Sequence, residues 1–481
     1  MEVLDIVIFI LYFFVMLGVG IYFYRKNTDI DDYYVGGRSL GSWHIGLSVV
    51  ATDVGGGFSI GLGGLGFLLG IAGSWMLFTG LIGAWLSAVV LIPKISHLSS
   101  KHKFFTFPQV FQHFYNNKVA LAAGIISAIG YIGFTSSQLL AGAKLASATF
   151  VEIDLEAALI IMGILVVVYT GIGGIKAVIY TDTVQWIILM SGLIFIGIPI
   201  SYYAIGGIET IRATLGPEFL SMGNVEWQQI VNWSVTIIPI WFVGMTLYQR
   251  IYASKGVKQA KKAWFIAGLF EWPLMAFMGV ILGLFSRVAF ETGMFTDLGY
   301  TIESAFDAEM GLPILLNTVL PTGLMGLMLS AYFSAILSTA DSCLMAASGN
   351  MQTDILSKLF KFKDGMKSQL RISQLITIVI GILAILLAST MTNVLELMLY
   401  SYAFMVSGLF IPILIALYGK SPNSNAALVA MIVGGTTTVV LTAFEFELPF
   451  GLDANIFGIS ASAIMYLISD IVSKKFNAIN S

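Results

Sequence analysis

The stretch that decides the fold is 48–64, which reads SVVATDVGGGFSIGLGG. It lies inside the apolar segment 41–70, which is long enough for a membrane-spanning helix, since such a helix needs about 20 apolar residues. Yet it contains a carboxylate, Asp53, followed by the glycine run 55–57. A charge is costly inside a membrane and glycine weakens a helix. The stretch therefore predicts a functional break in a membrane helix.

The composition indicates a polytopic membrane protein. Of the 481 residues, 57% are hydrophobic and 11% are charged, against about 25% charged in a typical soluble domain. The net charge of −3 gives no sign of nucleic-acid binding. Cys343 is the only cysteine, which excludes an intramolecular disulfide and a CxxC motif. Residues 3–23 are too long for a cleavable signal peptide and lack a small-residue cleavage motif, so we expect them to form the first span.

Apolar runs predict thirteen transmembrane helices, with boundaries accurate to a few residues. The predicted spans are 3–23, 41–70, 72–95, 119–149, 156–174, 177–203, 228–250, 263–288, 320–349, 372–390, 393–418, 425–443 and 454–473. If the loops alternate between the two sides, the 24 Lys and Arg residues all belong to one side except Lys144, Arg212 and Arg287. Positive residues collect on the cytoplasmic side. We therefore expect a multi-pass protein of the plasma (inner) membrane, with its N-terminus outside and its C-terminus in the cytoplasm.

Helix-weakening residues recur at matching positions in two halves of the chain. Five spans after 41–70, the span 228–250 carries Pro239 and Gly244 near its middle. Proline removes a backbone donor and glycine weakens the helix. Because five is an odd number, the second unit would be inverted relative to the first, as in transporters built from inverted repeats. For the glycine-rich tail 61–66, unwinding and close helix packing both remain open.

The expected organisation is therefore that of an all-α polytopic membrane protein with two related bundles. We expect a peripheral first helix and cytoplasmic loop (1–40), a first five-helix repeat (41–203), a second, inverted five-helix repeat (228–418), and two peripheral C-terminal helices (419–481).

Hydroxyl side chains gather in the ninth predicted span. The segment LSAYFSAILSTADSCLMAASGN (329–350) places Ser338 beside Thr339, with Asp341 within one turn. Hard cations prefer oxygen ligands, and unwound backbone inside a membrane protein needs partners for its carbonyls. Backbone carbonyls and two hydroxyls together fit a Na⁺ site. The other interpretation is that the hydroxyls bond to their own helix or join helices; Asp341, which is costly at mid-membrane, favours a site.

A third acidic position, Asp182, lies near the start of the span 177–203. It is either structural, paired with Lys176 or capping a helix, or part of an ion path, and the residues alone favour neither. The four histidines lie at interfaces or in loops, outside any HExxH or GxSxG context. We therefore expect the protein not to be an enzyme and to use no organic cofactor.

Four segments together resemble the sodium:solute symporter family, which includes the sodium–glucose, sodium–proline, sialic acid and choline transporters. They are DDYYVGGRSLGSW (31–43), ATDVGGG (51–57), YTGIGGIKAVIYTDTVQ (169–185) and FSAILSTADSCLMAASGNMQTDI (333–355). The third and fourth are specific, the order is the family's, and the resemblance covers essentially the whole chain. It implies a LeuT-like 5+5 inverted-repeat fold with broken first and sixth core helices, and Na⁺-coupled uptake by alternating access.

The resemblance also implies ligands for the coupling ion. The main Na⁺ site would consist of the carbonyls of Ala51, Val54 and Ala335 and the hydroxyls of Ser338 and Thr339.

Some members of the family hold a second sodium ion. Here that site would involve Asp182, Ser338, Asp341 and Ser342. Asp341 stands where two-sodium members carry a hydroxyl, so either a second Na⁺ or a proton is expected there.

The solute-binding residues implied by the resemblance lie at mid-membrane, near both broken helices. They are Asp53, Gly57, Phe58, Gln138, Trp241, Met245 and Tyr402. Phe58 stands where a sugar-binding member has a polar residue, which weakens the case for a sugar. Asp53 resembles the aspartate of the proline-type members, which favours an amino acid or a related polar solute.

The sequence thus predicts a Na⁺-coupled secondary active symporter whose partners are the lipid bilayer, Na⁺ and a small solute, with no obligatory protein partner and no nucleic acid. Two alternatives remain. A proton-coupled symporter of the same fold would use Asp53, Asp182 or Asp341 as its relay. A solute-sensing membrane module would signal through a partner, and the lack of an attached kinase or receiver domain argues against it.

Overall fold

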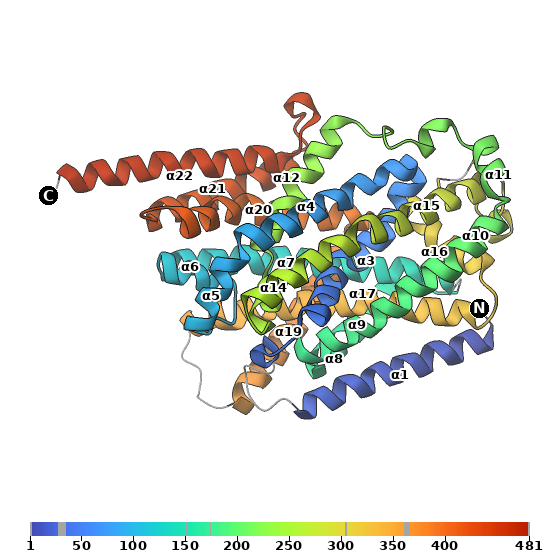
Figure 1. Cartoon of the computed structure of the whole chain (residues 1–481), viewed down its shortest axis with the longest axis horizontal. Coiled ribbons are helices and arrows are strands. Elements are labelled where there is room, and N and C mark those ends of the chain that lie inside the picture. Colours follow the sequence, from blue (N-terminus) through green and yellow to red (C-terminus); the bar gives the residue numbers. More distant parts are fainter. Residues whose placement is uncertain are drawn as a thin grey trace.

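The fold is a bundle of long helices. The computed structural model describes residues 2–26, 35–150, 152–173, 175–303, 305–359 and 366–479. Over these residues the regular structure is helical, apart from an isolated bridge between Leu40 and Ser254. Most helices run roughly along the long axis of the molecule, and the two termini lie at opposite ends of it (Figure 1). The predicted all-α architecture is confirmed.

The long helices follow the predicted spans closely. In the first half they are α1 (Val3–Lys26), α3 (Ser42–Leu69), α4 (Trp75–Val90), α7 (Asn117–Thr149), α8 (Leu155–Gly173) and α9 (Ile175–Gly192), which continues through a π-helical turn into α10 (Ile198–Ala204). In the second half they are α12 (Trp227–Val243), α13 (Met245–Ala253), α14 (Val257–Leu269), α15 (Ala276–Glu291), α17 (Leu324–Gly349), α19 (Met366–Ala388) and α20 (Val394–Tyr418). The last two are α21 (Ser424–Ala443) and α22 (Ala454–Ile479).

Shorter helices join these elements. They are α5 (Ile92–His102), α6 (Pro108–Phe114), α11 (Gly207–Thr214), α16 (Gly311–Val319) and α18 (Ser357–Leu359). A π-helical segment, η5 (Phe270–Met275), lies between α14 and α15. Residues 31–34 of the first family-like segment lie outside the described residues.

The number of membrane crossings is not settled by helix length alone. In the described residues, nine helical segments and one bent pair are long and apolar enough to cross a membrane. Two shorter apolar stretches, Val3–Val19 and Leu155–Val168, fall on the first and fifth predicted spans. One of the nine, Ser59–Val90, joins parts of two predicted spans. The thirteen crossings and the boundaries of the two repeats therefore stay predictions.

Both predicted helix breaks are present. Within α3, Gly55 has φ 39° and ψ −162°, far from helical values. In the second half, α12 and α13 are bent by 43° at Gly244. Pro239 lies inside α12 without ending it, and the break follows about one turn later. The two interruptions that the sequence indicated therefore both exist.

The glycine-rich tail of α3 serves helix packing. The backbone of 61–66 stays helical, since the one residue of α3 with non-helical angles is Gly55. A Cβ at Gly66 would lie 2.2 Å from the carbonyl oxygen of Val280 on α15, and one at Gly63 would lie 2.9 Å from Leu312 Cβ. Small residues at these positions allow the helices to approach closely.

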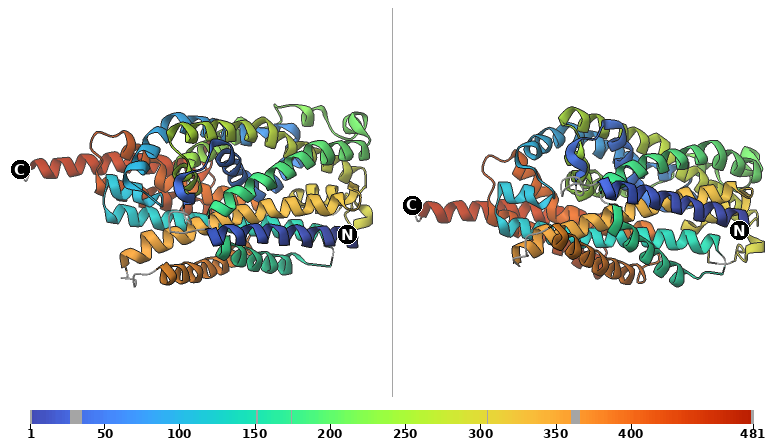
Figure 2. Two further views of the ribbon diagram at one scale, coloured as in Figure 1. Left: turned by 60° about the horizontal axis from the view of Figure 1, so that its bottom comes forward. Right: turned by 90° about the horizontal axis from the view of Figure 1, so that it is seen from below.

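The broken helix α3 lies at the centre of the bundle. It packs against α9, α14, α15 and α17, while α7 packs against α17 and α20. The helix α17 is buried along its whole length from Met325 to Gly349, apart from Leu327. By contrast, α21 and α22 pack mainly on each other and on α20, and α22 extends beyond the other helices (Figures 1 and 2). The break in α3 is thus enclosed by neighbouring helices.

Candidate functional site

The break in α3 lies directly against α17 and α7. A Cβ at Gly55 would lie 2.7 Å from Thr339 Oγ1, and one at Gly56 would lie 2.4 Å from Ile336 Cγ1. The N–H of Gly56 donates to Gln138 Oε1 at 2.8 Å, so Gln138 replaces a helical carbonyl as the acceptor. The glycines therefore open the backbone and bring it next to the hydroxyls of α17.

Three of the groups predicted for the main sodium site lie together. The Thr339 hydroxyl is 3.0 Å from the Ala51 carbonyl oxygen and 3.2 Å from that of Ala335, and all three residues are buried. The other two groups are placed differently. The Ser338 hydroxyl donates to the carboxylate of Asp182. Val54 lies in the turn before the break, and its side chain lies outside the described part.

This cluster, formed by Ala51, Ala335 and Thr339, connects the broken helix to α17. The contact between the two helices is the hydrogen bond from the Thr339 hydroxyl to the Ala51 carbonyl. Ala335 lies four residues before Thr339 in the same helix, so the second contact is a bond of the hydroxyl to its own helix. Hard cations prefer oxygen ligands such as these carbonyls and this hydroxyl.

Asp182 lies in a second polar cluster. It is fully buried and accepts hydrogen bonds from the hydroxyls of Ser48 on α3 and Ser338 on α17. Its Oδ2 lies 3.6 Å from Nη2 of Arg250. The buried carboxylate is therefore stabilised by a guanidinium group and two hydroxyls.

Arg250 is a site residue that sequence reasoning missed. It is 0% exposed and donates to Thr52 Oγ1 at 2.7 Å and to Ser342 Oγ at 2.8 Å. It thereby connects α13 to α3, α9 and α17. Its position at the end of a predicted span is equally typical of a cytoplasmic loop residue, so the sequence carries no clear signal of its burial.

The four residues predicted for a second ion do not form one cluster by direct contact, although Ser338 donates to Asp182. Asp182 and Ser342 both contact Arg250. Asp341 instead accepts a hydrogen bond from Thr170 on α8 at 2.5 Å, and its other oxygen has no hydrogen-bond partner in the described residues.

Two of the predicted solute-binding residues are buried aromatics. Trp241, at the end of α12, packs against α4, where a Cβ at Gly83 would lie 2.4 Å from its Cδ1. Its ring centroid is 6.3 Å from that of Trp264. Tyr402, on α20, packs edge-on against Phe134 at 5.0 Å.

The remaining predicted solute residues are placed as follows. Gln138 supports the broken backbone through Gly56. Met245 faces α6, where its sulfur accepts the N–H of Phe107 at 3.1 Å. Gly57 and Phe58 lie in α3, and the packing around Gly57 and the side chain of Phe58 lie outside the described part.

Asp53 lies beside a second buried carboxyl group, that of Glu271. Asp53 is 5% exposed and Glu271, in η5, is 0% exposed. The two carboxyl groups lie close enough to interact with each other, and Asp53 Oδ2 and both Glu271 oxygens have no hydrogen-bond partner in the described residues. Sequence reasoning missed Glu271, although it is the one acidic residue of the span 263–288. An acid inside a membrane span indicates function by default, and that signal was available.

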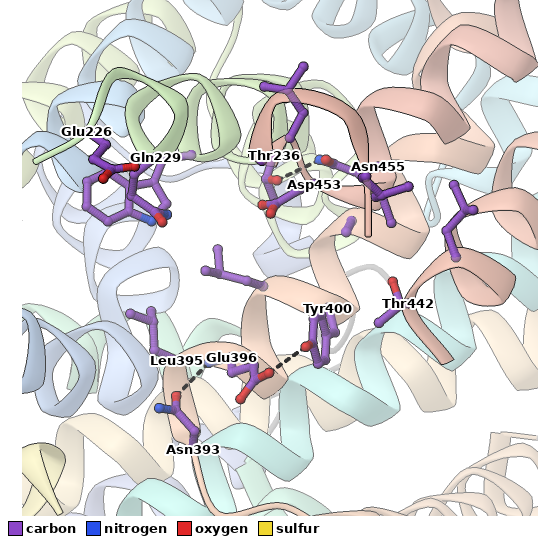
Figure 3. A pocket seen from close by; sticks show the side chains of 18 of the residues that line it. Glu226, Gln229, Thr236, Asn393, Leu395, Glu396, Tyr400, Thr442, Asp453 and Asn455 are labelled. Carbon is purple, nitrogen blue, oxygen red and sulfur yellow. Dashed lines mark hydrogen bonds between the residues drawn. The ribbon is translucent and has the colours of Figure 1, made fainter. Parts of the chain in front are cut away.

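A cavity of about 810 Å³ opens among α3, α12, α20 and the α21–α22 connection. Figure 3 shows Glu226, Gln229 and Thr236 across from Glu396 and Tyr400. Its acidic lining residues are Glu226, Glu396, Glu445 and Asp453, and none of its lining residues is Lys, Arg or His. None of the predicted site residues lines it either, so it is a space separate from the oxygen cluster.

Comparison with known proteins identifies relatives over nearly the full chain. The chain is 27% identical to the osmoregulated proline transporter of Bacillus subtilis over 97% of this chain and 94% of that protein. It is 27% identical to the sodium/proline symporter of Escherichia coli over 91% and 88% of the two chains. It is also 25% identical to a sodium/glucose cotransporter of Vibrio parahaemolyticus, over 93% and 86%.

Solved structures give the same fold. The chain matches a substrate-bound, outward-open Na⁺-coupled sialic acid symporter with a TM-score of 0.80, at 22% identity over 98% of each chain. It matches the nucleobase-cation-symport-1 transporter Mhp1 with a TM-score of 0.53, at 13% identity over 93% and 96%. The LeuT-like fold predicted from the sequence is therefore confirmed.

The model of the sodium:solute symporter family matches residues 33–434, which is most of the chain. The relatives are transporters and not enzymes. The chain therefore belongs to the sodium:solute symporter family, and it is a multi-pass membrane protein that couples Na⁺ to the transport of a small solute.

Proposed function

We propose that this protein imports an amino acid or a related polar solute together with Na⁺, by alternating access. The observation that carries the proposal is the position of the Thr339 hydroxyl, 3.0 Å from the Ala51 carbonyl and 3.2 Å from the Ala335 carbonyl. These oxygens belong to the broken helix and to the helix it packs against, so an ion bound there would hold the two together.

In this mechanism Na⁺ binds the carbonyls of Ala51, Val54 and Ala335 and the hydroxyls of Ser338 and Thr339. Ser338 would turn from Asp182 toward the ion, and Arg250 and Ser48 would continue to stabilise that carboxylate. The bound ion supplies the positive charge that the oxygen cluster lacks. It fixes the turn before Gly55 and with it the neighbouring solute site.

The driving force comes from the sodium gradient and the membrane voltage. With the N-terminus outside and the C-terminus in the cytoplasm, the acidic cavity opens to the outside. Each Na⁺ that moves inward gains ~2.3 kcal/mol per 100 mV. At that voltage one coupled ion supports roughly forty-fold accumulation of a neutral solute, since each ~1.4 kcal/mol is a factor of ten.

The solute would bind near Asp53, Gln138, Trp241 and Tyr402, with Gly57, Phe58 and Met245 as further predicted contacts. The names of the proline-transporting relatives support an amino acid. We assign Asp182, Asp341 and Ser342 to a second ion, either Na⁺ or a proton, with no organic cofactor and no obligatory protein partner.

A thermal-shift screen of the purified protein tests this function. The protein would be heated with a library of amino acids and related solutes, once in Na⁺ and once in K⁺. We expect a subset of amino acids to raise the melting temperature in Na⁺ only, and the best of them to enter proteoliposomes down a sodium gradient. Equal stabilisation in K⁺, with uptake driven by a pH gradient alone, would show proton coupling and overturn the proposal.

A further inference from the structure

The paired carboxyl groups of Asp53 and Glu271 have no part in the proposed sodium site. They come from the broken helix α3 and from η5, and both are buried. Asp53 Oδ2 and both oxygens of Glu271 have no hydrogen-bond partner in the described residues. Two adjacent carboxyl groups away from water do not both ionise unless a positive charge joins them. The pair therefore holds a shared proton or is suited to a cation.

Among the described residues, no positively charged group pairs with Asp53 or Glu271. The other ionisable groups that interact electrostatically with Asp53 are Tyr131, Cys343 and Tyr402, and tyrosine and cysteine are mostly neutral at pH 7. In the described parts of the chain, neither Asp53 nor Glu271 forms an ion pair.

Two buried bases of the described residues, Lys144 and Arg250, are bound to other acids. Lys144 lies 2.6 Å from Asp307 and 2.6 Å from Glu309. Arg250 is held by Asp182 and by hydroxyl groups. A positive charge at Asp53 and Glu271 would therefore have to come from a ligand.

Helix α4 approaches Glu271 closely through Gly80. A Cβ at Gly80 would lie 2.5 Å and 2.8 Å from the two oxygens of Glu271. The Glu271 carboxyl group therefore occupies the space that a side chain at position 80 would need. One helical turn further along α4, the ring of Trp241 packs directly against Gly83, where a Cβ would lie 2.4 Å from its Cδ1. The Trp241 indole N–H also has no partner in the described residues. A carboxyl pair and a neighbouring aromatic ring are the groups that bind organic cations.

The cavity described above has the matching charge. Its lining includes four acidic residues and no basic residue. An acidic cavity of this kind raises the local concentration of cations, although neither Asp53 nor Glu271 lines it.

We propose that Asp53 and Glu271 form a two-carboxylate site for the cationic nitrogen of the transported solute. The inference rests on the proposed function, because it assigns this site to the solute of the symporter. An ammonium group donates N–H bonds to both carboxylates and supplies the missing positive charge. A solute without a cationic nitrogen leaves these oxygens unpaired, so the solute class is an amine or an amino acid with its amine free.

Thermal shift in Na⁺ with matched probes tests the proposal. The cationic probes, each with a protonated amine, are L-proline, L-prolinamide, pyrrolidine and L-lysine; the probes without a cation are N-acetyl-L-proline and D-galactose. We expect at least one cationic probe, and neither of the others, to raise the melting temperature. In Glu271→Gln the half-saturating concentration of the best probe should rise about ten-fold or more, the usual effect of losing a charged hydrogen-bond partner.

Glu291→Gln is the matched control, because Glu291 is partly exposed and pairs with Arg287 at 2.6 Å, away from the site. It should leave probe binding unchanged. A rise in melting temperature of Glu271→Gln with Na⁺ alone would show that this variant is folded.

The proposal is wrong if no cationic probe stabilises the protein, if a cation-free probe stabilises it best, or if Glu271→Gln binds the best probe as tightly as the wild type. These outcomes are distinct from a failure of the proposed function. Stabilisation by a cation-free probe in Na⁺ alone keeps sodium coupling and overturns the carboxylate site. Stabilisation by cationic probes equally in Na⁺ and K⁺ keeps the site and overturns sodium coupling.

Discussion

At the scale of single residues, Gly55 decides the geometry of the site. Its φ of 39° is in a region that side chains rarely adopt, and its neighbours leave no space for a Cβ. Thr339 and Gln138 both contact the backbone at this point. Glycine is therefore needed at position 55 for two reasons: the positive φ disfavours any other residue, and the neighbouring side chains leave no space for a Cβ.

Gly55→Ala is expected to lower stability and to reduce the response to Na⁺. The added Cβ would lie 2.7 Å from Thr339 Oγ1 and 2.9 Å from Gln138 Oε1, and the strained backbone costs about 1–3 kcal/mol. Melting temperatures measured with and without Na⁺ check both effects. Gly18→Ala is the control, because a Cβ there meets nothing within 4 Å; an unchanged sodium response in Gly55→Ala would contradict the account.

Residue-scale prediction from the sequence was uneven, for a physical reason. Ala51 and Thr339 could be paired in advance only through the resemblance to the sodium:solute symporter family, because the glycine run and the adjacent hydroxyls by themselves indicate two polar segments and not their contact. Glu271 could have been found as a lone acid in an apolar span. Arg250 could not, because a basic residue at a span end is typical of both a solvated loop and a buried ion pair.

At the scale of elements, Arg250 connects four helices. It lies on α13, donates to α3 and α17, and pairs with Asp182 on α9. Removing one partner of a buried ion pair leaves the other charge unpaired, which costs about 3–5 kcal/mol. The helices that carry the oxygen cluster are thus connected by one guanidinium group.

Arg250→Gln should therefore lower the melting temperature strongly, by more than Asp182→Asn does. The double variant Arg250→Gln with Asp182→Asn should recover part of the loss, because it leaves no buried charge unpaired. Melting curves of all four proteins form a double-mutant cycle. Strictly additive losses would show that the two side chains do not stabilise each other.

Element boundaries were predictable where apolar runs end at polar residues. The break at Gly244 was indicated by Gly244 and Pro239 together. The span 263–288 was expected to be continuous, but it is interrupted at η5, where Trp272 has φ −137° and ψ 125°. Pro273 follows directly and removes a helical donor. The apolar run predicts the length of the span, but it does not predict a break in the helix within it.

At the scale of the whole molecule, the termini lie at opposite ends of the bundle (Figure 1), the arrangement expected for the predicted odd number of crossings. The overall fold was predictable because hydropathy, positive-inside bias and the two helix breaks all agree. The absolute orientation rests on the distribution of Lys and Arg alone.

Cysteine labelling in intact cells tests this orientation. The natural Cys343 is buried, which keeps background labelling low. Ser221→Cys, in the exposed segment before α12, should react with a membrane-impermeant maleimide added outside. Ser421→Cys, in the exposed turn between α20 and α21, should react only after the membrane is opened. The reverse pattern would overturn the predicted topology.

The central claim is that the oxygen cluster between α3 and α17 binds the coupling ion. Equilibrium binding of ²²Na⁺ to the purified protein tests it most directly. The double variant Ser338→Ala with Thr339→Ala should lose saturable binding. The control double variant Ser286→Ala with Thr149→Ala should keep it, because those hydroxyls bond only to carbonyls of their own helices. Full ²²Na⁺ binding in the Ser338 and Thr339 double variant would contradict the account.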